Sequence, residues 1–282
     1  MGRVCNVPEA TQVEVNTQQE LRGLRLLFSR LRSYFLWDPL IWLYTIIFGA
    51  LSLLSSFFDR SGGIQHGFAR LWSRTILKTI GAAPQMEGLE KVDTAKAAVY
   101  VVNHLSALDI PVLYAYLPFQ FRILAKKELF RYPFMGWHLQ RSGQIPVVLE
   151  NPRASVRSLN RAVATLQQGM SLVIFPEGGR SPEGQLHPFM GGAFYAALKA
   201  QADVVPMALV GTFEMLKMNT WHIKPGPLQL VVGRPISTMG MSTRDMEKVK
   251  QQAENEIARL YYSHAMVPDL RGQDHVRDEP AK

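Results

Sequence analysis

Two short polar segments carry the residue types in this sequence that could do acid–base chemistry. The first, residues 103–109 (NHLSALD), places His104 five positions before Asp109. An aspartate at the start of a helix can accept a hydrogen bond from such an imidazole, fix its tautomer and stabilise its protonated form. The pair therefore predicts a general base, His104, with an orienting carboxylate, Asp109. Because the sequence has no Gly-x-Ser-x-Gly nucleophile elbow, this base suits a hydroxyl that arrives on a substrate.

The spacing alone has a second interpretation, in which a histidine at a strand end caps the following turn. The same spacing recurs at His264 and Asp269, in the polar C-terminal region. Only His104 follows an apolar, strand-like run and precedes an apolar, helix-like one. That context favours the chemical interpretation for His104.

The second polar segment, residues 175–181 (FPEGGRS), has features of a site for a phosphate or a polyol. Gly178 and Gly179 let the backbone approach a ligand closely, and the guanidinium of Arg180 matches a phosphate group. Glu177 can accept hydrogen bonds from a polyol or position the arginine. Taken in isolation, the segment is more typical of a tight turn with a surface salt bridge.

Short apolar runs that alternate with helical patterns must position these two segments. The sequence predicts buried strands at 98–102, 121–124, 145–149, 172–175, 204–209 and 228–232, and helices at 153–168 and 242–263. Alternation of this kind predicts an α/β domain whose largely parallel sheet is flanked by helices. Each polar segment follows the C-terminal end of a predicted strand, which is where open α/β sheets place their ligands.

An apolar segment precedes this domain. Residues 39–58 contain no charged side chain and as a helix would span about 30 Å, close to the hydrocarbon thickness of a bilayer. Three interpretations compete: a membrane-spanning helix, a helix or helical hairpin that enters one leaflet, and a buried core helix. Basic residues flank the segment on both sides, which favours an anchor with both ends at one anionic surface.

Composition and patterning divide the 282 residues into four predicted parts: a polar basic leader (1–33), a membrane-anchoring helical segment (34–80), the α/β domain (81–264) and a polar tail (265–282). The 31 Lys and Arg against 23 Asp and Glu give a net charge of +8, which suits a membrane surface, a phosphorylated substrate or nucleic acid. The basic residues cluster around the apolar segment without an aromatic stacking platform, which argues against nucleic acid. No cluster has the spacing of a metal site, and the single cysteine, Cys5, excludes an intrachain disulfide.

Together, the two polar segments resemble the NHxxxxD and FPEGTRS motifs of the glycerophospholipid acyltransferases, in particular the 1-acylglycerol-3-phosphate acyltransferases. The separation of 73 residues between His104 and Glu177 is typical of that family. The stretch 125–129 (AKKEL) is similar to another family motif, and the resemblance covers roughly residues 70–235. The resemblance implies that residues 81–264 are the acyltransferase domain.

The resemblance implies an enzyme that moves a fatty acyl group directly from a thioester donor, acyl-CoA or acyl-carrier protein, to the free hydroxyl of 1-acylglycerol 3-phosphate, giving phosphatidic acid. No cofactor is implied beyond that co-substrate, and no metal. The expected partners are membrane lipids, with the enzyme at the cytoplasmic face of the membrane. The residues implied are catalytic His104 and Asp109, and substrate-binding Lys126, Glu177, Gly178 and Arg180.

Two positions depart from the family pattern. Gly179 stands where the family has threonine, and Leu149 stands where its second motif ends in arginine, so one cation is missing from the expected acceptor-phosphate site. Arg141 or Arg153 could substitute, or the acceptor could be glycerol 3-phosphate, another lysophospholipid or an amino-lipid. A catalytically silent lipid-binding protein is the alternative from another class, and both intact motifs argue against it.

Overall fold

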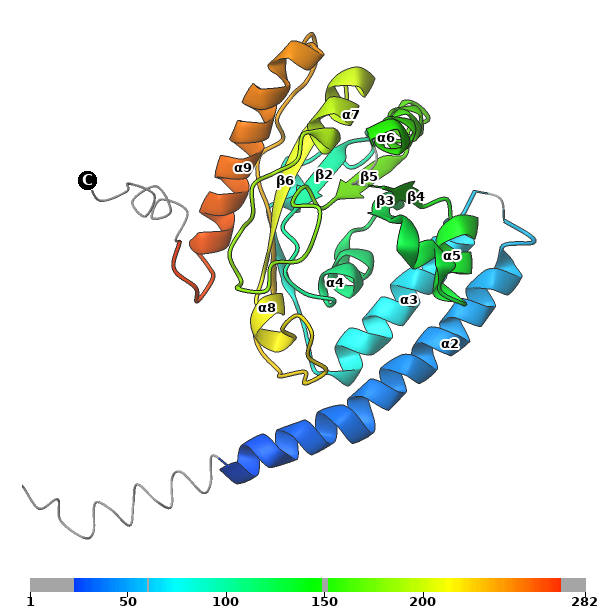
Figure 1. Cartoon of the computed structure of the whole chain (residues 1–282), viewed down its shortest axis with the longest axis vertical. Coiled ribbons are helices and arrows are strands. Elements are labelled where there is room, and N and C mark those ends of the chain that lie inside the picture. The colour runs from blue at the N-terminus through cyan, green and yellow to red at the C-terminus, as the bar shows by residue number, and fades with distance from the viewer. Residues whose placement is uncertain (1–22, 60, 149–151, 270–282) are drawn as a thin grey trace, which may run out of the picture.

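The computed structural model describes residues 23–59, 61–148 and 152–269, which form an α/β domain with a long helix along its outside (Figure 1). The described residues build a seven-stranded sheet in the order β1-β7-β6-β2-β5-β3-β4. β6 pairs with β7 antiparallel, and the other neighbours pair parallel. This confirms the predicted α/β fold with a largely parallel sheet. The strands are β1 (Gln85–Glu87), β2 (Val99–Val102), β3 (Phe121–Lys126), β4 (Ile145–Val147), β5 (Ser171–Ile174), β6 (Val204–Val210) and β7 (Gln229–Val232).

Helices cover both faces of the sheet. Those of the described chain are α2 (Asp38–Ser55), α3 (Gly63–Thr79), α4 (Asp109–Tyr116), α5 (Met135–Arg141), α6 (Pro152–Gln167), α7 (Gly192–Ala200), α8 (Thr212–Met215) and α9 (Met246–Tyr262). A π-helical segment, η1 (Ser33–Trp37), directly precedes α2, and η2 (Leu89–Lys91), η3 (Lys127–Arg131) and η4 (Thr243–Asp245) are short 3-10 helices. The predicted helix at 153–168 is α6, and the one at 242–263 is η4 with α9. A capping box of Ser242 and Asp245 begins the latter.

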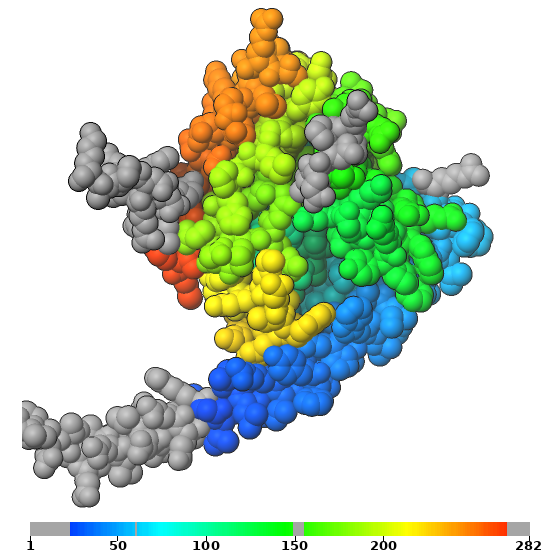
Figure 2. Space-filling view, viewed as in Figure 1, coloured from blue at the N-terminus to red at the C-terminus, as the bar shows by residue number. Residues whose placement is uncertain are grey.

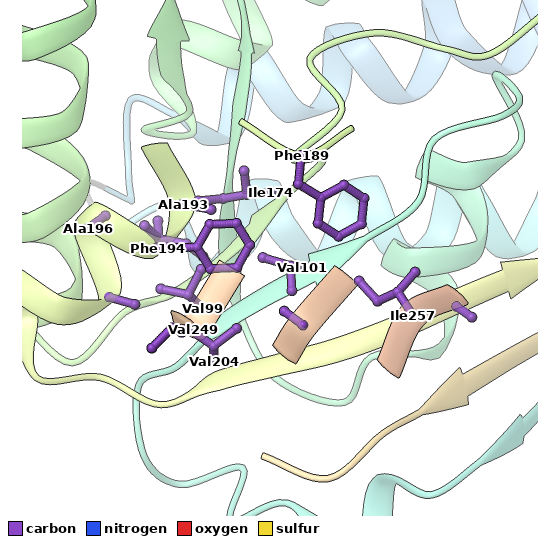
Figure 3. Packing of buried hydrophobic residues seen from close by; sticks show 14 of the residues in the cluster. Val99, Val101, Ile174, Phe189, Ala193, Phe194, Ala196, Val204, Val249 and Ile257 are labelled. Carbon is purple, nitrogen blue, oxygen red and sulfur yellow. The ribbon is translucent and has the colours of Figure 1, made fainter. Parts of the chain in front are cut away.

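The central strand β2 contributes side chains to two separate cores, because successive residues of a strand point to opposite faces. Val99 and Val101 join the core under α6, α7 and α9, part of which Figure 3 shows. Tyr100 and Val102 join the core on the opposite face, under α3 and α4. All four side chains are buried, so the strand that leads to His104 is fixed from both sides. The short strand β1 was not predicted, because its three residues are exposed and form no apolar run.

One continuous helix covers Gly23–Ser55 and includes η1 and α2. It is long and apolar enough to cross a membrane, and very little of its apolar window is buried. This exposure rules out the interpretation as a core helix, because a core helix buries its apolar side chains. The helix begins within the segment predicted as a polar leader. Trp72 Nε1 of α3 donates to Thr45 Oγ1 of α2 at 3.1 Å, which ties the helix to the domain.

Candidate active site

The predicted base and its carboxylate are in direct contact. His104 lies just after β2 and Asp109 is the first residue of α4, and His104 Nδ1 is 2.8 Å from Asp109 Oδ2. The same oxygen accepts the backbone N–H of Leu105 at 2.8 Å and of Ser106 at 2.9 Å. One carboxylate oxygen therefore holds both the imidazole and the tight turn that presents it.

These contacts determine which nitrogen of His104 is available. Asp109 Oδ2 already accepts two backbone N–H groups, so it acts as an acceptor toward His104 Nδ1 as well. The imidazole proton therefore lies on Nδ1, and the lone pair is on Nε2. The side chain of Asp109 is fully buried, whereas 19% of the His104 side chain is exposed. Phe175 stacks on the imidazole with ring centroids 4.0 Å apart. His104 is thus an oriented base with access to a ligand.

Two further residues of the first motif fix the turn to its surroundings. Asn103 Nδ2 donates to the carbonyl of Leu209 at 2.9 Å, and Asn103 Oδ1 accepts the N–H of Leu209 at 2.7 Å. These two bonds extend the pairing of β2 with β6 beyond the end of β2, with the side-chain amide of Asn103 in the place of a backbone amide. Ser106 Oγ donates to the carbonyl of Leu216 at 2.8 Å, which attaches the turn to the segment after α8.

Glu177 lies beneath the turn and uses both carboxylate oxygens on backbone groups. Oε1 accepts the N–H of His104 at 2.8 Å, and Oε2 accepts the N–H of His187 at 2.9 Å. Burial raises the pKa of Glu177 to about 7, and the two N–H donors act in the opposite direction. The structure therefore gives Glu177 backbone partners, where the sequence predicted contact with substrate.

A pocket of about 530 Å³ opens beside His104. Its volume is in the usual range for a small-molecule site. Lys126 at the end of β3 and Arg180 both line it, and neither side chain has a hydrogen bond or ion pair with another residue in the described part of the chain. The rest of the lining is largely apolar and includes Ile123, Leu124, Leu159, Ile174 and Ala193. The pocket thus combines a base and two cations with walls that suit a hydrocarbon chain.

The structure brings most of the predicted residues to this pocket. His104, Lys126, Gly178 and Arg180 line it, and Asp109 lies directly behind His104. Gly178 has a φ of 74°, a conformation that glycine adopts without strain, so the backbone lies against the pocket without a side chain.

Of the two arginines considered as substitutes for the missing cation, the structure describes the side chain of Arg141. Arg141 lies over the ring of Phe57, 5.2 Å from its centroid, and is not part of the pocket lining. Leu149 and the side chain of Arg153 lie outside the described residues, as do Cys5 and the last part of the predicted tail.

Comparisons with known proteins identify the family of this chain. The sequence model of the Acyltransferase family matches residues 83–210, a range that contains both motifs. A 1-acyl-sn-glycerol-3-phosphate acyltransferase of Helicobacter pylori is 32% identical over 178 residues, which cover 63% of this chain and 75% of that protein. The chain belongs to the acyltransferase family.

Other members of the acyltransferase family match a smaller share of their own length. A chloroplastic 1-acyl-sn-glycerol-3-phosphate acyltransferase of Arabidopsis thaliana is 35% identical over 61% of this chain and 48% of that protein. The enzyme of the same name from Cocos nucifera is 31% identical over 70% of this chain and 62% of that protein. The chain therefore spans about half to three fifths of these curated relatives.

The fold is also that of a solved member of the acyltransferase family. The crystal structure of the 1-acyl-sn-glycerophosphate acyltransferase from Thermotoga maritima has a TM-score of 0.68 with this structure and 23% sequence identity. The match covers 93% of this chain and 100% of that one. Because it leaves out so little of the chain, the match includes most of the helical region before β1.

Four residues of this acyltransferase-family chain shape the site without having been predicted as site residues: Asn103, Ser106, Phe175 and His187. The first three lie within the two motif segments, and a polar side chain at a strand end is a signal that could have found Asn103. His187 contributes only its backbone N–H. No pattern of side chains marks such a contribution, so it becomes visible only in the structure.

Proposed function

We propose that this protein transfers a fatty acyl group from a thioester donor to the free hydroxyl of 1-acylglycerol 3-phosphate, with phosphatidic acid as the product. The observation that carries this proposal is the position of His104, oriented by Asp109, in the wall of a pocket that combines two cations with an apolar lining. The names of the relatives support the same reaction.

The chemistry follows from the tautomer of His104. Nε2 takes the proton of the acceptor hydroxyl while the hydroxyl oxygen attacks the carbonyl carbon of the thioester. Asp109 stabilises the imidazolium that forms. When the carbon–sulfur bond breaks, the leaving thiolate takes the proton from Nε2, so that the base is restored and an ester replaces the thioester. The attack is direct and uses no nucleophile of the protein.

The lining of the pocket supports the substrate class. Lys126 and Arg180 are suited to a phosphate group, because charge-assisted hydrogen bonds to phosphate are strong and a guanidinium can form two in parallel. The apolar walls suit an acyl chain, since each methylene removed from water contributes about 0.8 kcal/mol. Acyl-CoA and acyl-carrier protein are both candidate donors, and neither requires a further cofactor.

Attachment to the cytoplasmic face of a membrane is part of the proposal. The exposed apolar helix Gly23–Ser55 supports membrane association, and Arg25, Arg30 and Arg32 add basic charge to its N-terminal part. At this position the pocket is within reach of lipid substrates.

The test is an acylation assay with the purified full chain. Radiolabelled acyl-CoA and acyl-carrier protein are each offered with 1-acylglycerol 3-phosphate, glycerol 3-phosphate, other lysophospholipids and an amino-lipid. We expect phosphatidic acid as the main product and its loss in His104→Ala. The matched control is His264→Ala, because His264 has the same spacing to an aspartate but lies after α9. A wild-type chain inactive with every acceptor would refute the proposed function, and near-normal turnover of His104→Ala would refute the base.

A further inference from the structure

Five large apolar side chains are exposed within nine positions of the segment that joins β3 to β4. We call this group the aromatic turn: Leu129, Tyr132, Phe134, Met135 and Trp137. The exposed fraction reaches 57% for Tyr132 and 49% for Trp137. Single exposed apolar residues are normal on a protein surface, whereas a contiguous group marks an interaction site.

The backbone of the aromatic turn is strained around Phe134. This residue has a φ of 59° and a ψ of −62°, and the N–H of Met135 donates to the carbonyl of Pro133 at 2.6 Å. These values describe a γ-turn with positive φ, which is rare and unfavourable for a bulky residue. Glycine would relieve the strain, yet a phenylalanine ring is held here at the surface. Strain of this kind is concentrated at functional positions.

The aromatic turn and helix α5 pack against α2. Phe134 Cβ lies 3.6 Å from the position that a Cβ of Gly49 would occupy, and Ser52 Oγ is 2.6 Å from His138 Nδ1. The guanidinium of Arg141 lies over the ring of Phe57. Figures 1 and 2 show α5 lying against the C-terminal part of α2, so the aromatic turn lies next to the part of the helix that exposes Leu51 and Leu54.

The aromatic turn also adjoins the mouth of the active-site pocket. Leu129 is exposed at the surface and lines the pocket at the same time. The segment 126–141 carries four Lys and Arg and one glutamate. Aromatic rings interleaved with cations are typical of residues that lie at the headgroup level of a bilayer, where anionic lipids attract the basic side chains.

We propose that the aromatic turn is a second membrane-contacting element, which inserts into an anionic phospholipid surface beside α2 and sets the mouth of the pocket against that surface. The contact rests on the membrane association proposed above and does not depend on the acyl transfer. It requires that Tyr132 and Trp137 leave water when the protein binds a bilayer, while the opposite side of the domain stays in water.

The test places an environment-sensitive fluorophore at chosen positions of the full chain. Cys5→Ser removes the natural cysteine, and Tyr132→Cys or Trp137→Cys then introduces a single labelling site. Gln252→Cys on the exposed side of α9 is the matched control. The proteins are bound to vesicles of phosphatidylcholine with phosphatidylglycerol, or of phosphatidylcholine alone, that contain lipids brominated on the acyl chain. We expect a blue shift and several-fold quenching at 132 and 137, greater with phosphatidylglycerol, and neither at 252.

Two outcomes would overturn the proposal: labels at 132 and 137 that stay as exposed to water as the label at 252, or labels that are shielded by an acidic acyl-carrier protein and not by vesicles. Phe134→Gly provides a second measurement, because it removes the ring and relieves the backbone. We expect lipid quenching of the label at 132 to fall while the melting temperature is kept. A lowered melting temperature with unchanged quenching would mean a purely structural role.

The label measurement is independent of the proposed activity. His104→Ala should give the same quenching pattern as the active chain. If the wild-type chain acylates no acceptor but its labels are shielded by vesicles, the proposed function is refuted and the membrane contact of the aromatic turn is supported.

Discussion

The backbone N–H of His104 donates to Oε1 of Glu177 at 2.8 Å, so the second motif holds the proposed base of the first in place. Oε2 of the same carboxylate accepts the N–H of His187, ten residues further along. Glu177 therefore connects three segments around the pocket, and its bond to His104 joins the two motifs across 73 residues.

Replacing Glu177 with glutamine should change how stability depends on pH. The pKa of Glu177 is raised to about 7 by burial, above its ordinary value. Between roughly pH 4.5 and 7 the folded state retains a proton that the unfolded state has released, so this group's contribution to stability is present below that range and is lost as pH rises through about 7. The loss amounts to up to about 3 kcal/mol.

Urea unfolding of the wild type and Glu177→Gln at several pH values isolates this contribution. Glutamine does not titrate, and its amide nitrogen cannot accept one of the two N–H bonds, so the variant should be less stable at low pH and approach the wild type as pH rises. A difference in unfolding free energy that is constant from pH 4.5 to 7.5 would contradict the raised pKa.

Asp109→Asn should reduce kcat by a factor of about 10²–10⁴, the usual contribution of an oriented base. The amide oxygen can still accept the N–H groups of Leu105 and Ser106, but a neutral amide stabilises the imidazolium of His104 poorly. The measurement is steady-state acylation with saturating substrates, and circular dichroism with urea unfolding checks that the fold is retained. A kcat within tenfold of the wild type would remove Asp109 from the mechanism.

Lys126→Ala and Arg180→Ala should each raise the KM for a phosphate-bearing acceptor by roughly 10- to 100-fold, because hydrogen bonds to charged groups contribute about 1.5–3 kcal/mol. kcat should change less, since neither side chain is needed for proton transfer. Lys199→Ala is the matched control, because Lys199 lies on α7 outside the pocket lining. The assignment fails if the KM for an acceptor without phosphate rises equally.

Asn103→Ala should lower the free energy of unfolding by roughly 2–6 kcal/mol. It would leave both the N–H and the carbonyl of Leu209 without their partner at a buried position, and each unsatisfied group costs about 1–3 kcal/mol. Urea denaturation measures the change, with Asn160→Ala on the exposed side of α6 as the control. If both variants are equally stable, Asn103 has no structural role at the end of β2.

The α/β fold could be predicted from the sequence because its signals are local. The strand around Val99 to Val102 is a short continuous apolar run, and the sequence around helix α6 has an asparagine suited to capping, an early proline and a glycine after the last helical residues. Such signals depend on burial and backbone preference within one element. They do not determine pairing partners, so the antiparallel placement of β7 beside β6 and the exposed strand β1 appear only in the structure.

The residue types of the site were likewise determined by the sequence: the histidine, its aspartate five positions later, the glycines and Arg180 occur in recognisable motifs. Tertiary structure alone decided that Glu177 binds the backbone of His104, and that Phe134 is held in a strained turn beside α2. The physical reason is that these relationships join segments distant in the chain through backbone groups and close packing. The pattern of residue types along the sequence does not indicate such contacts, because they form only when the whole domain folds.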